Sequence, residues 1–166
     1  TDRQRDSHAR DDMAIMPLES VCESVVDCKN RTPPYTEVGH PVVRTPNVRN
    51  GKLVESDMRY TDQSSYKIWT ARAVPRPMDV LFTREAPLGE ACLVPENFKC
   101  CLGQRMMLFR ADKSLIDPQY LLFSLMSPFV QDQLLKSKGG TTVGHARVAD
   151  IRNLPIPVFP KEKQVK

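Results

Sequence analysis

The sequence predicts an α+β fold: a single globular domain with a mixed, mostly antiparallel twisted sheet and a few flanking helices. Three apolar runs at 79–83, 90–94 and 105–111 are typical of strands, and a turn separates the first two. An apolar pattern of helical spacing begins after Asp117-Pro118. With 166 residues, 40% of them hydrophobic, the chain is long enough for one domain with a substantial core.

The N-terminal part divides into a polar tail and the start of the domain. Residues 1–12 are almost wholly polar and cannot join a core, so we expect a tail or linker there and the domain over residues 13–160. In the segment MPLESVCESVVD the apolar residues recur at helical spacing, which predicts a short amphipathic helix.

The middle of the chain predicts strands joined by turns. PVVRTPNV has the pattern of a short strand, and Asn50-Gly51 predicts a tight turn into KLVE. The runs DVLFT, EACLV and RMMLFRA are apolar enough for central strands, and apolar side chains alternate along the last of them.

Helix signals follow the strands. Asp117 can accept hydrogen bonds from free backbone amides and Pro118 fits a first helical turn, so a helix is expected to begin there. Ser127-Pro128 repeats the signal and predicts a second helix or a sharp kink, ending before Gly139. The run LPIPVFP contains three prolines, which restrict it to an edge strand or an extended connection, and a further helical segment is expected after Pro160.

Charge and cysteine content limit the function classes. The net charge is only +4, but Lys136 to Arg152 holds four basic residues and one acid, a local excess of +3. Five cysteines without C-x-x-C spacing argue against a disulfide framework or a metal site and favour the reducing cytoplasm. No stretch approaches the roughly 20 apolar residues that span a bilayer, so we expect no membrane association.

Catalytic patterns are weak throughout the chain. TPPY resembles the motif with which DNA amino-methyltransferases hold a flipped base, but threonine replaces the usual Asp, Asn or Ser, and no Gly-rich cofactor loop follows a strand. The three histidines lie in a tail or in loops, and Glu85 and Glu90 lack the companions of a nuclease site. We expect no catalytic residues, no metal and no cofactor.

Five segments in order resemble a target recognition domain of the specificity subunit of type I restriction-modification systems. The resemblance covers about Pro17 to Gln164. The segments are CKNRTPPYTEVGHPVVRTPNVRNGKL, DVLFTREAPLGE, LGQRMMLFR, YLLFSLMSPFVQDQLL and KGGTTVGHARVADIRNLPIPVFPKEKQ.

The resemblance implies a non-catalytic DNA-binding component. Subunits of this family typically carry two recognition domains, each reading one half of a split target in double-stranded DNA, and each domain precedes a long spacer helix. Methylation and restriction subunits assemble on them. Residues 161–166 would be the start of a truncated spacer helix, so the surface that recruits those subunits should be absent from this chain.

Two alternatives stay open. A fragment of a DNA methyltransferase or nuclease is suggested by TPPY and the basic loop. A protein-interaction domain is suggested by an adaptable set of apolar side chains. These are Met106, Met107, Met126, Phe129 and Phe159.

Candidate DNA-binding residues fall in two groups. Phosphate contacts require cations and hydroxyls; the candidates are Lys136, Lys138, Thr141, Thr142 and Arg147 in the C-terminal loop, together with Arg84. Base reading requires paired donors or acceptors. The candidates lie in the loop-rich segment between the predicted strands, and they are Arg44, Asn47, Arg49, Gln63, Lys67, Arg72 and Arg76.

Overall fold

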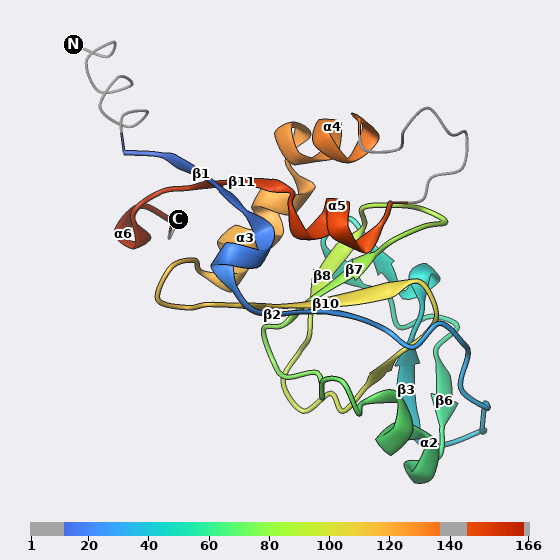
Figure 1. Ribbon diagram of the computed structural model, residues 1–166. Helices are drawn as coiled ribbons and strands as arrows, with labels where there is room; N and C mark the ends of the chain where they lie inside the picture. Colours follow the sequence, from blue (N-terminus) through green and yellow to red (C-terminus); the bar gives the residue numbers. More distant parts are fainter. Residues whose placement is uncertain (1–11, 137–145, 165–166) are drawn as a thin grey trace.

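The computed structural model describes residues 12–136 and 146–164, and it confirms the α+β class. Its largest sheet has four antiparallel strands in the order β2-β10-β7-β8 (Figure 1). These strands are β2 (Cys22–Asp27), β7 (Val80–Thr83), β8 (Ala91–Leu93) and β10 (Met106–Ala111). The three apolar runs are therefore strands as predicted, with β7 and β10 at the centre.

The segment 16–27 is not the predicted helix. It forms the end of strand β1 (Ala14–Pro17), a single 3-10 turn η1 (Leu18–Val21), and then β2. Two β-branched residues, Val25 and Val26, pair with Phe109 and Leu108 of β10. A partner strand about 80 residues further along the chain thus overrides a local spacing that fits a helix.

Three helices cover one face of the four-stranded sheet (Figure 1). They are α3 (Pro118–Met126), α4 (Pro128–Lys136) and α5 (Val148–Arg152). The Asp117 carboxylate accepts hydrogen bonds from the amides of Gln119 at 2.9 Å and Tyr120 at 3.2 Å, which confirms the predicted helix start. Behind the helices, Phe82 and Phe109 pack with ring centroids 5.1 Å apart.

The first and last described strands form a ribbon of their own. Strand β11 (Pro155–Val158) pairs antiparallel with β1, which confirms the predicted edge position of the proline-rich run. The short helix α6 (Lys161–Gln164) follows, as expected after Pro160. The buried Gln164 amide accepts from the Asp117 N–H at 2.7 Å and donates to the Phe159 carbonyl at 2.7 Å, so it fastens this segment to the start of α3.

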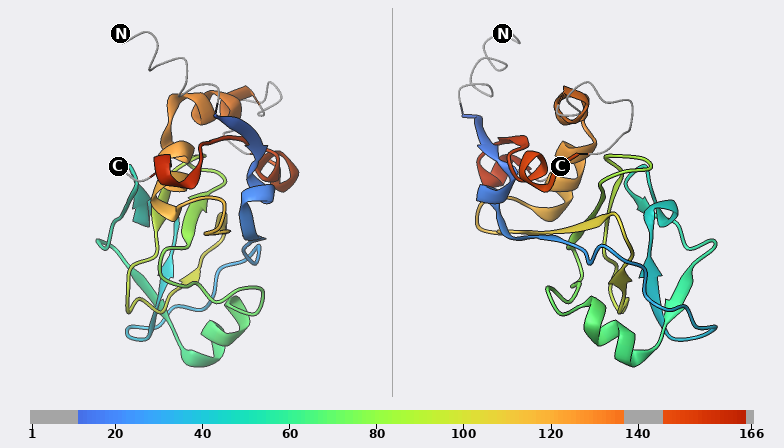
Figure 2. Two further views of the ribbon diagram at one scale, coloured as in Figure 1. Left: turned by 90° about the vertical axis from the view of Figure 1, so that its left-hand side faces the viewer. Right: turned by 45° about the vertical axis from the view of Figure 1, so that its right-hand side comes forward.

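Smaller sheets and a helix lie on the other face of the four-stranded sheet, at the opposite end of the molecule from α3 to α5 (Figure 2). A three-stranded sheet has the order β6-β3-β9, with β3 and β9 parallel, and a hairpin joins β4 to β5. The elements are β3 (His40–Val43), η2 (Thr45–Asn47), β4 (Val48–Arg49), β5 (Lys52–Leu53), β6 (Arg59–Thr61), α2 (Gln63–Trp69) and β9 (Cys101–Leu102).

Two predictions for this part meet different outcomes. The Asn50-Gly51 turn is confirmed, because it closes the β4–β5 hairpin with φ angles of 52° and 79°, the conformation these residues favour. The single strand predicted over PVVRTPNV is instead split by η2, since Pro46 cannot donate to a ladder.

The sheet is buried on both faces. Met107 and Phe109 of β10 belong to a core under the helices, while Met106 and Leu108 belong to a second core with Leu102. We call these halves the helix-covered side (the first core with α3, α4 and α5) and the α2 side (the second core with β3 to β6, β9 and α2).

Candidate nucleic-acid interface

Three of the six predicted phosphate-binding residues, Lys136, Arg147 and Arg84, lie in the described part of the chain. Lys138, Thr141 and Thr142 lie outside the described residues. Lys136 is exposed at the last position of α4. Arg147 immediately precedes α5, and its side chain is 81% exposed although it pairs with Asp150 at 3.0 Å. Both described cations are therefore accessible to a ligand.

Arg84 stands where the loop returns to the sheet. Its N–H donates to the Arg105 carbonyl at 2.9 Å, and its own carbonyl accepts from the Ala146 N–H at 3.4 Å. Its Nε is buried, with no hydrogen-bond partner among the described residues. The neighbouring Glu85 pairs with the half-exposed Arg105 at 2.7 Å. Arg84 thus links the end of the loop to the turn that precedes β10.

Three of the predicted base-reading residues are used inside the fold. Asn47 is fully buried, and its amide accepts from the Arg44 N–H and donates to the Val54 carbonyl, both at 3.0 Å. A side chain without exposed surface cannot touch a base, so Asn47 is removed from the base-reading set.

Arg44 and Arg49, which flank Asn47 in the sequence, also form hydrogen bonds within the fold. Arg44 donates to the Asp57 carbonyl at 2.6 Å, and Arg49 donates to the Thr45 carbonyl at 2.6 Å. A guanidinium already bonded to backbone carbonyls has fewer free donors for a base edge. Both arginines therefore have a structural role, and base reading by either of them stays a prediction.

The other predicted base-reading residues lie on the surface around α2. Lys67 and Arg76 are exposed, and the Arg72 side chain is 58% exposed. Gln63, at the start of α2, is hydrogen-bonded to the ring of His40, which also stacks on Tyr66 at 3.9 Å between ring centroids. Base reading by these four residues stays a prediction.

A cluster that sequence reasoning missed lies beside α2. The indole N–H of Trp69 donates to the Arg31 carbonyl at 2.9 Å. The Arg31 guanidinium lies 5.1 Å, and the Lys29 ammonium 5.8 Å, from the centroid of the Trp69 ring. The only signal in the sequence was the basic K-N-R run shortly before Pro33-Pro34.

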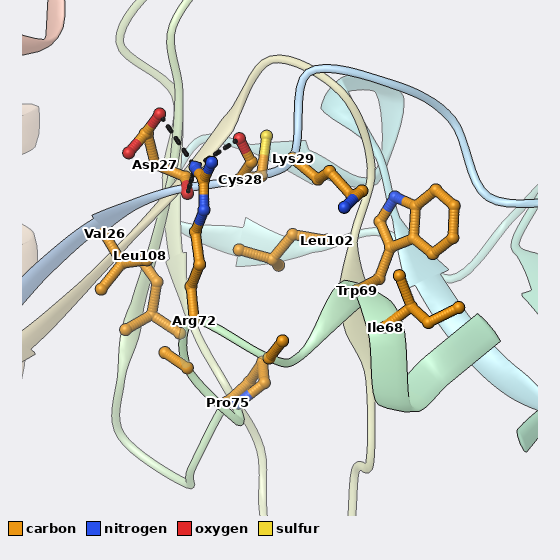
Figure 3. Close-up of a pocket in the computed structure, with 12 residues that line it drawn as sticks. Val26, Asp27, Cys28, Lys29, Ile68, Trp69, Arg72, Pro75, Leu102 and Leu108 are labelled. Atoms are coloured by element: carbon orange, nitrogen blue, oxygen red, sulfur yellow. Dashed lines mark hydrogen bonds and ion pairs between the residues drawn. The ribbon is translucent and has the colours of Figure 1, made fainter. Parts of the chain in front are cut away.

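Two of these residues, Trp69 and Lys29, line a pocket of about 120 Å³. Trp69 and Arg72 stand on opposite sides of it, with Leu102 between them and Lys29 at its edge (Figure 3). Arg72 is held in place because its guanidinium donates to the Asp27 carbonyl at 3.0 Å and pairs with the Asp27 carboxylate at 3.2 Å.

Cys28, which follows β2, connects this pocket to the start of β10. The Cys28 sulfur accepts from the Met106 N–H at 3.2 Å, and the residue also lines the pocket. Burial raises the pKa of the Cys28 thiol, while the N–H groups of Met106 and Arg105 and the positive charge of Arg84 act in the opposite sense.

Six cations around the pocket and the Arg84 turn form what we call the basic strip. Asn30 and Gln104 bridge its two halves with a hydrogen bond of 3.4 Å. Three of the six cations pair with an acid, namely Asp27, Glu85 or Asp150, so the strip keeps a net charge of +3. Its members are Lys29, Arg31, Arg72, Arg84, Arg105 and Arg147.

Residues 10–166 match the family model of the type I restriction modification DNA specificity domain. The chain belongs to this family. The match covers nearly the whole sequence and includes every member of the basic strip. The family resemblance inferred from the sequence motifs is thereby confirmed.

Relatives of this type I DNA specificity domain are much longer. A specificity subunit of the MjaX type I restriction enzyme of Methanocaldococcus jannaschii is 22% identical to this chain. The match covers 93% of this chain and 37% of that subunit. The HsdS subunit of Thermoanaerobacter tengcongensis, a crystal structure, superposes with a TM-score of 0.62 at 22% identity, covering 92% of this chain and 34% of that one.

The S subunit of the type I restriction-modification system of M. genitalium has the same fold, with a TM-score of 0.57 at 17% identity. That match covers 92% of this chain and 36% of the S subunit. The specificity domain thus spans about a third of the length of the relatives it matches.

Other functional signals are sparse in the described part of the specificity domain. Residues 12–136 and 146–164 hold no group of three His, Cys, Asp or Glu side chains that could bind a metal ion. Within those same ranges no helix is long and apolar enough to cross a membrane. Met106 and Met107 of the alternative apolar surface are fully buried, so they belong to the core.

Proposed function

We propose that this domain binds double-stranded DNA through the basic strip and reads one half of a bipartite target, without catalysing a reaction. It does so as part of a type I specificity subunit on which methylation and restriction subunits act. The observation that carries the proposal is the strip itself, because hydrogen bonds connect Ala146 to Arg84, Arg84 to Arg105, and the neighbouring Gln104 to Asn30, between Lys29 and Arg31.

The chemistry of the strip suits a duplex backbone. Exposed lysine and arginine side chains gain affinity by neutralising phosphates, and these contacts carry no sequence information. Sequence reading then falls to outward-facing donors beside the strip. Among the described residues we assign this role to Lys67 and Arg76, which are exposed. Arg44, Asn47, Arg49 and Arg72 are held by hydrogen bonds within the fold.

Binding is tested by fluorescence anisotropy with labelled duplexes at several salt concentrations. We expect affinity to fall steeply as salt rises, and the double variant Lys29→Gln/Arg31→Gln to lower the salt slope by about two, roughly one per phosphate contact. Lys113→Gln is the matched control, because Lys113 follows β10 at the end opposite Arg105. An unchanged slope in the double variant would contradict the strip assignment.

Sequence specificity is tested by selection from a random duplex library with the full chain. An enriched half-site of a few base pairs is the expected result. Enrichment of no sequence, with salt-dependent binding intact, would reduce the proposal to backbone binding alone. Methyl transfer by the chain alone, with S-adenosylmethionine as donor, would instead favour the methyltransferase alternative.

A further inference from the structure

We propose that the pocket beside Trp69 accepts one unpaired base from the bound DNA. The inference rests on the proposed function, because the pocket opens within the basic strip. It goes further in assigning the pocket a ligand: a single planar heterocycle attached to an anionic backbone.

The size and walls of the pocket select a flat ring. Its volume of about 120 Å³ is well below the roughly 300 Å³ at which sites for drug-sized ligands begin, so it holds one small ring system. The Trp69 indole forms one side and the Arg72 side chain the other (Figure 3). Leu102 and Leu108 line the interior. An indole face and a guanidinium both stack on nucleobases, whatever the base identity.

The rim matches the charge of a nucleotide. Lys29 and Arg31 sit over the Trp69 ring, and Arg72 is fixed by its bonds to Asp27. The one carboxylate at the pocket, that of Asp27, is neutralised by Arg72 at 3.2 Å. A base seated between Trp69 and Arg72 would therefore have its phosphates beside cations.

A base that is stacked and paired in a duplex cannot reach this pocket. Entry requires a base that has left the stack, as in a bulge or a strand that is being opened. The pocket should therefore distinguish DNA with one extrahelical base from intact duplex, while the rest of the strip should not.

Trp69 is the only tryptophan of the chain, so its fluorescence reports on this pocket directly. We would titrate the full chain with three duplexes of identical sequence: fully paired, with one bulged thymine, and with an abasic residue at the bulge. The bulged thymine should bind about fivefold or more tighter than the abasic bulge, as expected for one base stacked on an aromatic ring. It alone should strongly quench Trp69.

Filling the pocket should abolish this preference. Ala73→Leu places a larger side chain among the lining residues and keeps Trp69 as the probe; Ala71→Leu does so from an exposed position if the first variant melts early. Ala14→Leu, at an exposed position on β1, is the matched control. The pocket variants should bind all three duplexes alike, with unchanged affinity for the paired one.

Each outcome decides between the two proposals. Equal affinity for the three duplexes, with equal quenching, would overturn the pocket assignment and leave duplex binding intact. Binding of none of them would overturn the proposed function. The pocket would then be tested by titrating Trp69 fluorescence with thymidine monophosphate alone. Saturable quenching that Ala71→Leu removes would support base binding in the pocket, and the absence of quenching would overturn it.

Discussion

The two faces of the central sheet are stabilised in different ways. On the helix-covered side the core consists of apolar side chains such as Phe82, Phe109 and Leu121, all fully buried. On the α2 side, many short segments are tied together by polar side chains bonded to backbone carbonyls. Asn47 donates to Val54 and Thr61 to Pro34, and both side chains are buried.

This difference explains which polar residues are available for a ligand. Where loops are long and strands short, backbone groups lack ladder partners and side chains must satisfy them. Arg44 and Arg49 serve that purpose on the α2 side. The cations left for DNA are those that keep exposed surface, such as Arg31 and Arg147. An abundance of arginine in a segment therefore does not by itself indicate base reading.

The largest loss of stability is expected from a truncation in the core of the helix-covered side. Phe109→Ala should lower the free energy of unfolding by about 3–5 kcal/mol, because it leaves a cavity against Phe82. Phe123→Ala is the matched control, since Phe123 is 71% exposed on α3 and should change stability by less than about 0.5 kcal/mol. Urea denaturation measures both. Similar losses in the two variants would remove the distinction between core and surface.

A smaller loss is expected from the polar scaffold of the α2 side. Asn47→Ala leaves the Arg44 N–H and the Val54 carbonyl without their partner and should cost about 1–3 kcal/mol. Asn153→Ala, which removes one hydrogen bond at an exposed position, should cost less. DNA affinity per folded molecule should stay unchanged in Asn47→Ala. A selective change in sequence preference without loss of stability would restore the base-reading role.

Alkaline pH tests the apolar part of the α2 side. Burial raises the pKa of the Cys92 thiol from 9.0 to about 12. Below pH 9 both states keep this proton; from pH 9 to 12 only the unfolded state releases it, so stability falls as pH rises. The contribution is about 1.4 kcal/mol per pH unit.

Cys92→Ala should make the fall of the unfolding free energy with pH shallower by the amount expected for one proton. Denaturation at pH 8, 9.5 and 10.5 measures this slope. The same slope in the wild type and the variant would show that the thiol ionises without unfolding. That result would mean that the second core is more open to solvent than its full burial implies.

The smallest stability effect is expected at the basic strip. Asp27→Asn removes the acid that pairs with Arg72 across an exposed contact of 3.2 Å, so stability should change by less than about 1 kcal/mol. Affinity for DNA should rise at low salt, because one negative charge leaves the strip, and the gain should shrink at high salt. Asp57→Asn, beside Arg59, is the control. Weaker binding in Asp27→Asn would indicate that Arg72 needs its partner for position.

Local chemistry in the sequence was sufficient for part of the fold. The alternation in RMMLFRA, the Asp117 cap and the Asn50-Gly51 turn each depend on neighbouring residues, and each prediction is confirmed. The predicted helix over 16–27 was wrong because β2 takes its conformation from a distant partner strand.

The candidate site depends still more on distant contacts. Trp69 and Arg31 are 38 residues apart in the sequence, and only the fold brings them together. The burial of Asn47 also depends on the fold, since its amide donates to the carbonyl of Val54, which follows the β4–β5 hairpin. Residue type alone could identify donors but could not tell which of them face outward.

The β1–β11 ribbon has a consequence for how such a fold can be handled. Because Ala14 pairs with Val158, the fold has its entry and its exit side by side. A segment from β1 to β11 could therefore be inserted into a host protein through two neighbouring junctions. The pairing of β1 with β11 would be kept, because both strands belong to the segment. A domain with neighbouring ends can be replaced by another domain of the same kind without a change in the chain path of the host protein.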